Sequence, residues 1–242
     1  MNDVRVCSVV VRWSRGRPVR ILALRDELVG REFDDPAAWW PDFPGVVGGR
    51  DRVAGGTWCA TRIETGTTAL VVNRPQKRIA DPGAPSRGLL PLLGAMHGAA
   101  WLSQVDLSGM ASFALVLATP ERLTAWDFDG DDVTVLEHPE GTSMITSGGA
   151  EDLRAERHLR SFTEADFPQG WCALAQAQPP SDDPGALVVR HEREGRVFAT
   201  VFGQLAEAQP GRLHLEYSRQ PWTTGAWTSF DAPGQRSGGD EG

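Results

Sequence analysis

Cys7 stands at the head of the apolar run Cys7–Val11, close to the start of the chain. A thiol with its ordinary pKa of about 8.5 is only weakly ionised at neutral pH, so a reactive cysteine needs a base or a cation beside it. If Cys7 were the first residue of the mature chain, its own α-amino group, with a pKa of about 7.7–8.0, could accept the thiol proton. One residue would then supply both nucleophile and base. The alternative is a structural cysteine, because free cysteine is among the most buried residue types.

Arg25 and Asp26 directly follow a second apolar run, Val19–Leu24. The β-branched and aromatic residues of Val4–Trp13 and Val19–Leu24, with a turn between them, predict a β-hairpin. The end of its second strand could bring the Arg25 guanidinium beside the Cys7 thiol. The neighbouring Asp26 carboxylate could then orient an α-amino group. A solvated turn is the alternative interpretation of these charges.

Two further segments could complete such a site. Gly55 and Gly56 would let the backbone approach another group closely. The amide of Asn73, at the end of the predicted strand Thr67–Val72, could donate a hydrogen bond to an oxyanion. A tight turn would explain the glycines equally well, and Asn73 precedes Arg-Pro, where a turn residue is common.

The elements that must position these residues are predicted from the apolar patterns, which give strands, a helix, strands, helices and strands again. Besides the hairpin, the predicted strands are Thr57–Arg62, Thr67–Val72, Phe113–Ala118, Leu123–Asp127, Val133–His138, Ser143–Thr146, Ala186–Arg190, Val197–Leu205, Arg212–Ser218 and Gly225–Phe230. The predicted helices are Arg87–Gln104, Glu151–Phe162 and Ala165–Ala177. Ser147 or the glycines that precede the second helix are expected to cap it. Residues 30–56 are expected to form a long functional loop. This order predicts antiparallel sheets with helices on their outer faces, an α+β sandwich. We expect one domain over residues 1–231 and a disordered, glycine-rich tail over residues 232–242.

Composition narrows the class of protein. A net charge of −8 over 242 residues argues against an electrostatic nucleic-acid binder. The three cysteines, Cys7, Cys59 and Cys172, fit no metal-binding spacing, and the sequence shows no signal peptide and no apolar run long enough to span a membrane. We therefore expect a cytoplasmic protein with free thiols that requires no metal or other cofactor.

Taken together, the motifs resemble the NRDE family, also called the transport and Golgi organisation protein 2 family. They occur in one order with short gaps: Cys7-Ser8-Val9-Val10-Val11, Arg25-Asp26-Glu27, Trp40-Pro41, Gly48-Gly49-Arg50-Asp51, Gly55-Gly56-Thr57-Trp58, Asn73-Arg74-Pro75 and Ser86-Arg87-Gly88. The family is named after an Asn-Arg-Asp-Glu motif, whose first position is Leu24 in this chain. The match is dense over residues 6–93 and looser towards residue 230.

The resemblance implies a four-layer αββα sandwich of antiparallel sheets, the fold of the N-terminal-nucleophile (Ntn) hydrolases. It also implies cleavage of a linear, non-peptide amide or a related acyl bond. The implied catalytic residues are Cys7 as nucleophile, Arg25 as the contact to thiolate and substrate, Asp26 as the group that orients the amine, and Asn73 as oxyanion support. The residues expected to bind the substrate, a small amide or an amphipathic acid, are Trp58, Arg74 and Arg87.

Three positions depart from the family pattern. Ala114 stands where family members usually carry an asparagine, and it offers no side-chain hydrogen bond. Ser147 takes the place of a second, longer asparagine. A late Gly-Thr-Arg motif appears here as Gly195-Arg196-Val197, which moves the arginine by one residue and turns it to the other face of its strand.

These departures leave a second function open, a non-catalytic binding or trafficking protein on the same scaffold. Relatives in this family have been linked to haem and to lipid or acyl-CoA handling. An apolar pocket with an arginine rim would suit an amphipathic acid. His97 and Cys59 are conceivable haem ligands, although a lone histidine on an apolar helix is more often a core residue.

Whether residues 1–6 are present in the mature protein distinguishes the two proposed functions. Lysine occurs once, at Lys77, among 24 lysines and arginines, which is typical of a GC-rich genome. In such a genome a GTG codon for Val6 could be the true start, so that Met1–Arg5 would not be part of the protein. Removal of the initiator methionine would then expose the Cys7 amine. If the chain starts at Met1 and stays uncleaved, Cys7 has no free amine and the binding function is favoured.

Overall fold

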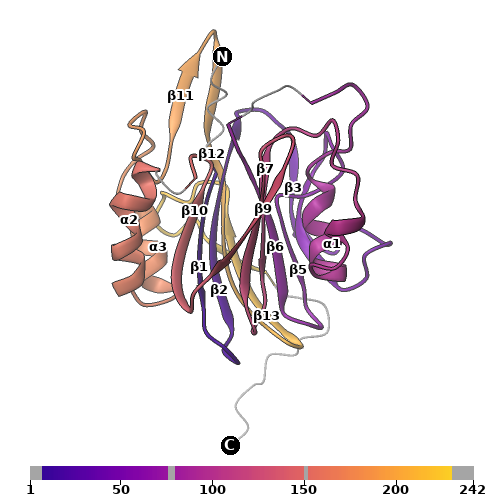
Figure 1. Cartoon of the computed structure of the whole chain (residues 1–242). Helices are drawn as coiled ribbons and strands as arrows, with labels where there is room; N and C mark the ends of the chain where they lie inside the picture. Colours follow the sequence, from indigo (N-terminus) through magenta and orange to yellow (C-terminus); the bar gives the residue numbers. More distant parts are fainter. Residues whose placement is uncertain (1–6, 76–79, 150–151, 231–242) are drawn as a thin grey trace, which may run out of the picture.

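The structure is a computed structural model that describes residues 7–75, 80–149 and 152–230. Within these residues, two antiparallel sheets pack face to face, and helices cover their outer surfaces (Figure 1). The four layers confirm the predicted αββα sandwich. The predicted tail, residues 232–242, lies outside the described residues, as do residues 1–6.

The first sheet is built around the N-terminal hairpin. β1 (Ser8–Trp13) pairs antiparallel with β2 (Val19–Leu28), which confirms the predicted hairpin. The described strands of this sheet run in the order β10-β1-β2-β12-β13-β14, and β11 pairs with β12. Their bounds are β10 (Gly141–Thr146), β11 (Arg190–Arg193), β12 (Arg196–Gln209), β13 (Arg212–Ser218) and β14 (Thr228–Phe230). The predicted strand Ala186–Arg190 was therefore placed too early, because the paired segment begins at Arg190.

The second sheet follows the chain in simple order, from β3 to β9. Its strands are β3 (Phe33–Ala37), β4 (Val46–Asp51), β5 (Cys59–Arg62), β6 (Thr67–Asn73), β7 (Phe113–Ala118), β8 (Leu123–Phe128) and β9 (Val133–His138). The prediction of one long loop over residues 30–56 was wrong, since β3 and β4 lie within it. A Cβ on Gly48 would lie 2.3 Å from the Cys59 carbonyl oxygen, and one on Gly49 would lie 2.5 Å from the Trp58 ring. Glycine is therefore required at both positions of β4, because a larger side chain would clash with Cys59 or Trp58.

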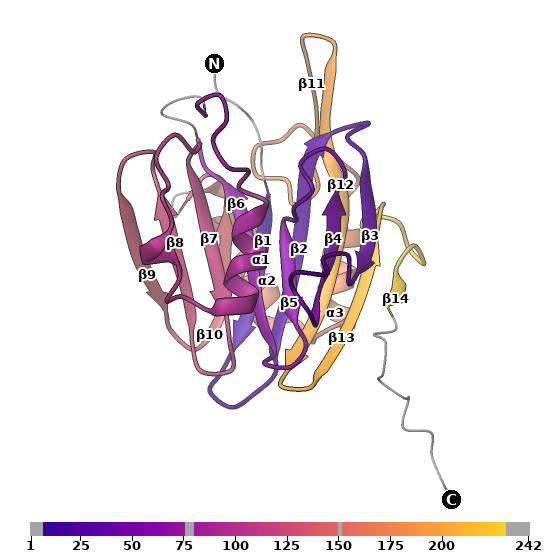
Figure 2. The same cartoon turned by 90° about the vertical axis from the view of Figure 1, so that its right-hand side faces the viewer.

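The helices form the two outer layers. Figure 2 faces the side on which α1 (Leu89–His97) covers the second sheet. α2 (Leu153–Glu164) and α3 (Gln169–Gln176) cover the first sheet. The predicted helix Arg87–Gln104 is shorter than expected, because α1 ends at Gly98 with φ +69° and only a short 3-10 turn (Leu102–Gln104) follows. The predicted cap of α2 was also wrong: Asp152 accepts the hydrogen bond from the backbone N–H of Arg154. None of the described helices is both long and apolar enough to cross a bilayer.

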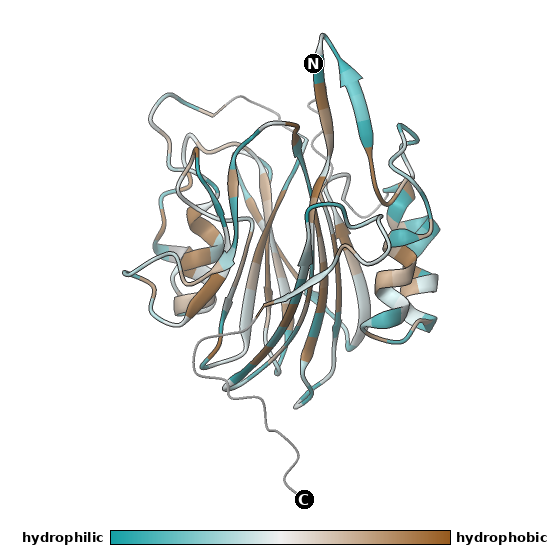
Figure 3. Ribbon diagram, turned by 180° about the vertical axis from the view of Figure 1, so that it is seen from behind, coloured by the Kyte–Doolittle hydropathy of each residue, from teal (hydrophilic) through white to brown (hydrophobic). Residues whose placement is uncertain are grey.

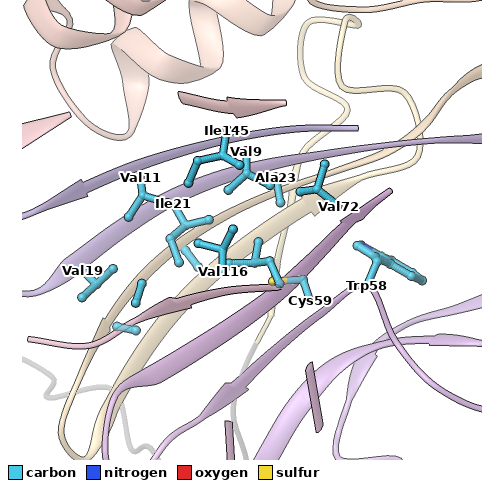
Figure 4. Packing of buried hydrophobic residues seen from close by; sticks show 14 of the residues in the cluster. Val9, Val11, Val19, Ile21, Ala23, Trp58, Cys59, Val72, Val116 and Ile145 are labelled. Carbon is cyan, nitrogen blue, oxygen red and sulfur yellow. The ribbon is translucent and has the colours of Figure 1, made fainter. Parts of the chain in front are cut away.

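The main core lies between the two sheets. Figure 4 shows Val9 and Ile21 of the first sheet among the side chains that pack towards Val116 and Cys59 of the second. Successive side chains of a strand point to opposite faces, so the neighbouring residues of β1 and β2 pack instead on α2 and α3. Cys7 belongs to the inter-sheet cluster. The fold therefore directs its side chain inward, between the sheets.

The β11–β12 hairpin differs from the rest of the first sheet. It projects beyond the layers in Figure 1, and β11 is hydrophilic in Figure 3, where most other strands carry long hydrophobic stretches. Gly195, with φ +71°, lies at the turn between β11 and β12. The Gly195-Arg196-Val197 segment thus lies at the tip of this hairpin.

Candidate active site

A cavity of about 130 Å³ lies where the ends of several strands meet. It is formed by the residue before β1, the far part of β2, the ends of β4 and β6, and the segment that leads into α1. Six of the seven predicted site residues line it: Cys7, Arg25, Asp26, Trp58, Asn73 and Arg87. Positions from 7 to 87 in the sequence are thus gathered around one cavity.

Cys7 is held by Ser147, in the turn that directly follows β10. Its backbone nitrogen lies 3.0 Å from the Ser147 hydroxyl oxygen, and its carbonyl oxygen accepts a hydrogen bond from Ser147 N across 3.1 Å. β1 pairs Ser8 with Leu24, so the same register brings Cys7 opposite Arg25. Backbone pairing therefore fixes the thiol at the cavity wall.

The Cys7 thiol is a weak acid in this environment. Burial, followed by the charge of Asp26, raises its pKa to about 11, and the opposing charge of Arg25 is not sufficient to reverse this. With that pKa, only about one molecule in ten thousand carries a thiolate at pH 7. Nucleophilic attack by Cys7 therefore requires a base that takes the proton during the reaction.

Arg25 is enclosed by aromatic rings and carboxylates. Its guanidinium carbon lies 4.5 Å from the Trp58 ring centre and 5.3 Å from that of Phe33. Its Nη2 lies 2.9 Å from Asp51 Oδ2 and 3.5 Å from Glu27 Oε2. Its Nη1 is buried and has no hydrogen-bond partner among the described residues. Stacking and ion pairing leave this nitrogen as the one able to contact a thiolate or a reacting group.

Asp51 is the main anchor of the site that sequence reasoning missed. Its carboxylate binds the Arg31 guanidinium across 2.7 and 3.1 Å and accepts hydrogen bonds from the backbone N–H groups of Val53 and Ala54. Burial alone would raise the pKa of Asp51. The hydrogen bonds, led by those from Arg31 and Ala54, outweigh burial and hold this pKa below its usual range. The available signal was its place at the end of the Gly48-Gly49-Arg50-Asp51 motif.

Asp26 lies behind the thiol and is almost completely buried. Its Oδ1 accepts a hydrogen bond from the Thr200 hydroxyl across 2.5 Å. Its Oδ2 lies 3.9 Å from Arg154 Nη1 and has no hydrogen-bond partner in the described part of the chain. Burial raises the pKa of Asp26 to about 7, against the opposing effects of Thr200 and Arg154. Thr200 and Arg154 were also missed, because they lie far from Asp26 in the sequence.

The opposite wall is formed by Asn73 and by the segment before α1. Asn73 ends β6, and its side-chain amide makes no hydrogen bond to the described residues. Arg87 donates from Nη1 to the Ser112 carbonyl oxygen across 2.8 Å. A Cβ on Gly56 would lie 2.4 Å from the backbone of Gly88, so Gly56 permits the close approach that brings this segment to the cavity.

Other predicted residues lie elsewhere. Arg74 does not line the cavity: it pairs with Asp127 across 2.6 Å and contacts the Thr146 carbonyl oxygen. Cys59 is buried in the core and accepts a hydrogen bond from Gln204, whereas His97 is exposed at the end of α1. Neither lines the cavity, whose volume is below the roughly 300–1,000 Å³ of ordinary small-molecule pockets. Cys59 and His97 therefore do not meet at this cavity.

The three departures from the family pattern have different structural outcomes. Ala114 is buried between the sheets, where its methyl group contributes only packing. Val197 pairs with Glu192 on the projecting hairpin and does not line the cavity. Ser147, in contrast, contacts Cys7 directly. Its short side chain keeps a polar contact at the head of β1.

The antiparallel sheets, their outer helices and the cysteine at the head of the first strand together define an Ntn-hydrolase-like fold. The chain belongs to the Transport and Golgi organisation 2 family, whose model matches residues 7–135. The structure is similar to that of the Caenorhabditis elegans N-acylethanolamine-hydrolyzing acid amidase ortholog, with a TM-score of 0.50 over 91% of this chain and 94% of that chain. At 11% sequence identity this similarity concerns the fold alone. No curated protein matches the chain by sequence.

Proposed function

We propose that this protein is a cysteine Ntn hydrolase that cleaves a linear, non-peptide amide or a related acyl bond when Cys7 carries a free α-amine. The observation that carries the proposal is the geometry at Cys7. Its thiol and its backbone nitrogen lie at the head of β1, with the thiol in a cavity lined by Arg25, Asp26 and Asn73. A reduced thiol is required, which a cytoplasmic location would maintain.

The weak acidity of the thiol supports the need for the amine. A resting thiolate is disfavoured by burial and by Asp26. A free amine on the same residue accepts the thiol proton as Sγ attacks the carbonyl carbon. The Sγ–C bond forms, the C–N bond breaks, and the proton passes to the departing nitrogen. Water then hydrolyses the thioester and regenerates the thiol.

Two groups are suited to hold that amine. Ser147 Oγ lies 3.0 Å from the Cys7 nitrogen and accepts its hydrogen bond. The buried Asp26 carboxylate has an Oδ2 that accepts no hydrogen bond within the described residues, and Arg154 Nη1 lies 3.9 Å from it. Once the α-amine has taken the thiol proton, it would add a positive charge beside Asp26, and a buried carboxylate is stabilised by a nearby cation.

Asn73 and Arg25 are suited to the carbonyl side of the reaction. The Asn73 amide faces the same cavity and is not engaged by the described residues. An amide donor fixed at a strand end can stabilise the oxyanion that forms during attack. Arg25 remains in place through Asp51 and Trp58 and adds positive charge near sulfur and oxygen.

The test begins with the amino terminus. The intact mass of the protein from its native cells shows whether Cys7 is the first residue. A chain in which residues 1–6 are replaced by a single methionine, which the host then removes, is assayed against a panel of linear amides. We expect turnover and a thioester adduct on Cys7 that appears within one turnover.

The matched controls are the full 242-residue chain and the Cys7→Ala variant of the shortened chain, both of which we expect to be inactive. Native protein that retains residues 1–6 and still turns over amides would contradict the proposal. So would equal activity of the Cys7→Ala variant.

A further inference from the structure

Arg154 is a buried cation that joins α2 to the head of β1. It is 2% exposed and is held by Asp152, with Nη2 2.7 Å from Asp152 Oδ2 and Nε 3.2 Å from Oδ1. The Asp152 carboxylate is itself fixed by the Thr146 hydroxyl across 2.7 Å. The helix N-terminus and the end of β10 therefore hold the guanidinium rigidly.

The remaining nitrogen of this guanidinium points towards the proposed active site. Arg154 Nη1 lies 3.3 Å from the Ser8 hydroxyl oxygen and 3.9 Å from Asp26 Oδ2. Ser8 directly follows Cys7, and Asp26 lines the cavity. Arg154 thus reaches the residues behind the thiol without lining that cavity.

Few other charged groups face Asp26. Thr200 contacts it from β12 and is uncharged, Cys7 faces it from the head of β1, and Arg25 and Glu27 flank it on β2. Of these, Arg25 is paired with Asp51. Within the described residues, Arg154 is the cation whose charge acts on Asp26.

We propose that Arg154 is a positioning residue that keeps the Asp26 carboxylate charged and fixed behind Cys7. The catalytic importance of Arg154 rests on the proposed function. The effect of Arg154 on the protonation of Asp26, and thereby on the reactivity of the Cys7 thiol, does not depend on it. Loss of Arg154 lets Asp26 take up a proton. A neutral Asp26 no longer opposes ionisation of the thiol, so Cys7 becomes more reactive towards an alkylating agent.

The test is the rate at which iodoacetamide modifies Cys7 in the full chain at pH 8, followed by mass spectrometry of the Cys7 peptide. We expect R154A to react about three to ten times faster than the unchanged chain and D26N to show a similar gain. The double variant R154A/D26N should react no faster than D26N alone. General loosening of the structure would instead raise the rate further in the double variant, and that result would overturn the proposal.

Chemical rescue separates charge from packing. Arg154 also lines a second cavity of about 350 Å³, together with His191 and Arg193, which gives small solutes access to the space that R154A creates. Guanidinium at tens of millimolar should return the R154A rate towards that of the unchanged chain, whereas urea, a neutral molecule of the same shape, should not. Equal effects of the two solutes would contradict the proposal.

The matched control is R157A, on the same helix. Arg157 pairs with Asp183 across 3.0 Å at the surface, and its loss should leave the Cys7 rate unchanged. If R154A does not fold, R154K and R154Q replace it: the charged R154K should keep the original rate and R154Q should show the increase, while equal rates would overturn the proposal. Alkylation needs no turnover, so absent amidase activity would reject the proposed function and leave this test intact.

Discussion

The Ser147 hydroxyl oxygen accepts a hydrogen bond from the Cys7 nitrogen across 3.0 Å, and Ser147 N returns one to the Cys7 carbonyl oxygen across 3.1 Å. The pair extends the ladder of β1 and β10 by one step beyond Ser8 and Thr146. A main-chain register thus fixes the nitrogen that would act as the base, and a side chain shorter than the family's asparagine makes the contact.

Ser147→Ala removes this acceptor and leaves the backbone pairing in place. In the chain that begins at Cys7, we expect kcat/KM to fall about two- to tenfold, the effect of one hydrogen bond worth about 0.5–1.5 kcal/mol. Ser143→Ala, on β10 opposite Val11, is the matched control and should retain full activity. Equal losses in both variants would show that Ser147 has no specific role.

The Cys7 pKa of about 11 predicts slow alkylation of the full chain at neutral pH. The rate of modification by iodoacetamide should rise about tenfold per pH unit from pH 7 to 9, because the thiolate fraction does so below the pKa. N-acetylcysteine, whose thiol is exposed to water, should begin to level off near its own, lower pKa. A plateau for Cys7 below pH 9 would contradict the burial argument.

The raised pKa of Asp26 predicts that its contribution to stability decreases with increasing pH. Its pKa of about 7 in the folded protein lies above the ordinary value of about 3.9, so between these values the folded state binds more protons than the unfolded state. The contribution of Asp26 to the free energy of unfolding therefore falls as the pH rises from about 4 to 7 and is constant above that range.

The Asp26 contribution is isolated by comparison with D26N, because the half-buried histidines are present in both proteins. The free energy of unfolding of the unchanged chain minus that of D26N, from urea denaturation, should decline across this interval. A difference that is flat, or that rises with pH, is incompatible with a raised pKa for Asp26.

Arg25→Met should destabilise the fold as well as the site. Arg25 is 4% exposed, and its loss leaves the largely buried Asp51 and Glu27 carboxylates with Arg31 alone. We expect a loss of about 3 kcal/mol in the free energy of unfolding, at the lower end for a broken buried pair. Chemical denaturation checks this value.

The matched control is Arg50→Met. Arg50 pairs with Asp34 but is 35% exposed, so its removal should cost about 0–1 kcal/mol. If the two variants lose equal stability, the enclosure of Arg25 by Trp58 and Phe33 contributes nothing measurable.

Local patterns predicted most of the elements because strand and helix signals arise from neighbouring residues. Phe113–Ala118, Val133–His138 and Arg212–Ser218 have the predicted bounds. The failures have tertiary causes. β4 contains Gly48 and Gly49 because Trp58 and Cys59, which lie later in the chain, leave no space for a Cβ. Such a requirement cannot be detected within a local window.

The sequence by itself determined the order of elements, the hairpin that carries Cys7 and Arg25, and the family motifs up to Arg87. These features depend on residue type and on short spacings along the chain. The register of a hairpin likewise follows from the local hydrophobic pattern and the turn. Only the tertiary structure decided which groups surround Cys7. Ser147, Arg154 and Thr200 reach Cys7 and Asp26 from more than 120 residues away, and Arg74 turns to Asp127. The acidity of a buried group depends on the dielectric and the charges that packing places around it, and these come from strands paired across the whole chain.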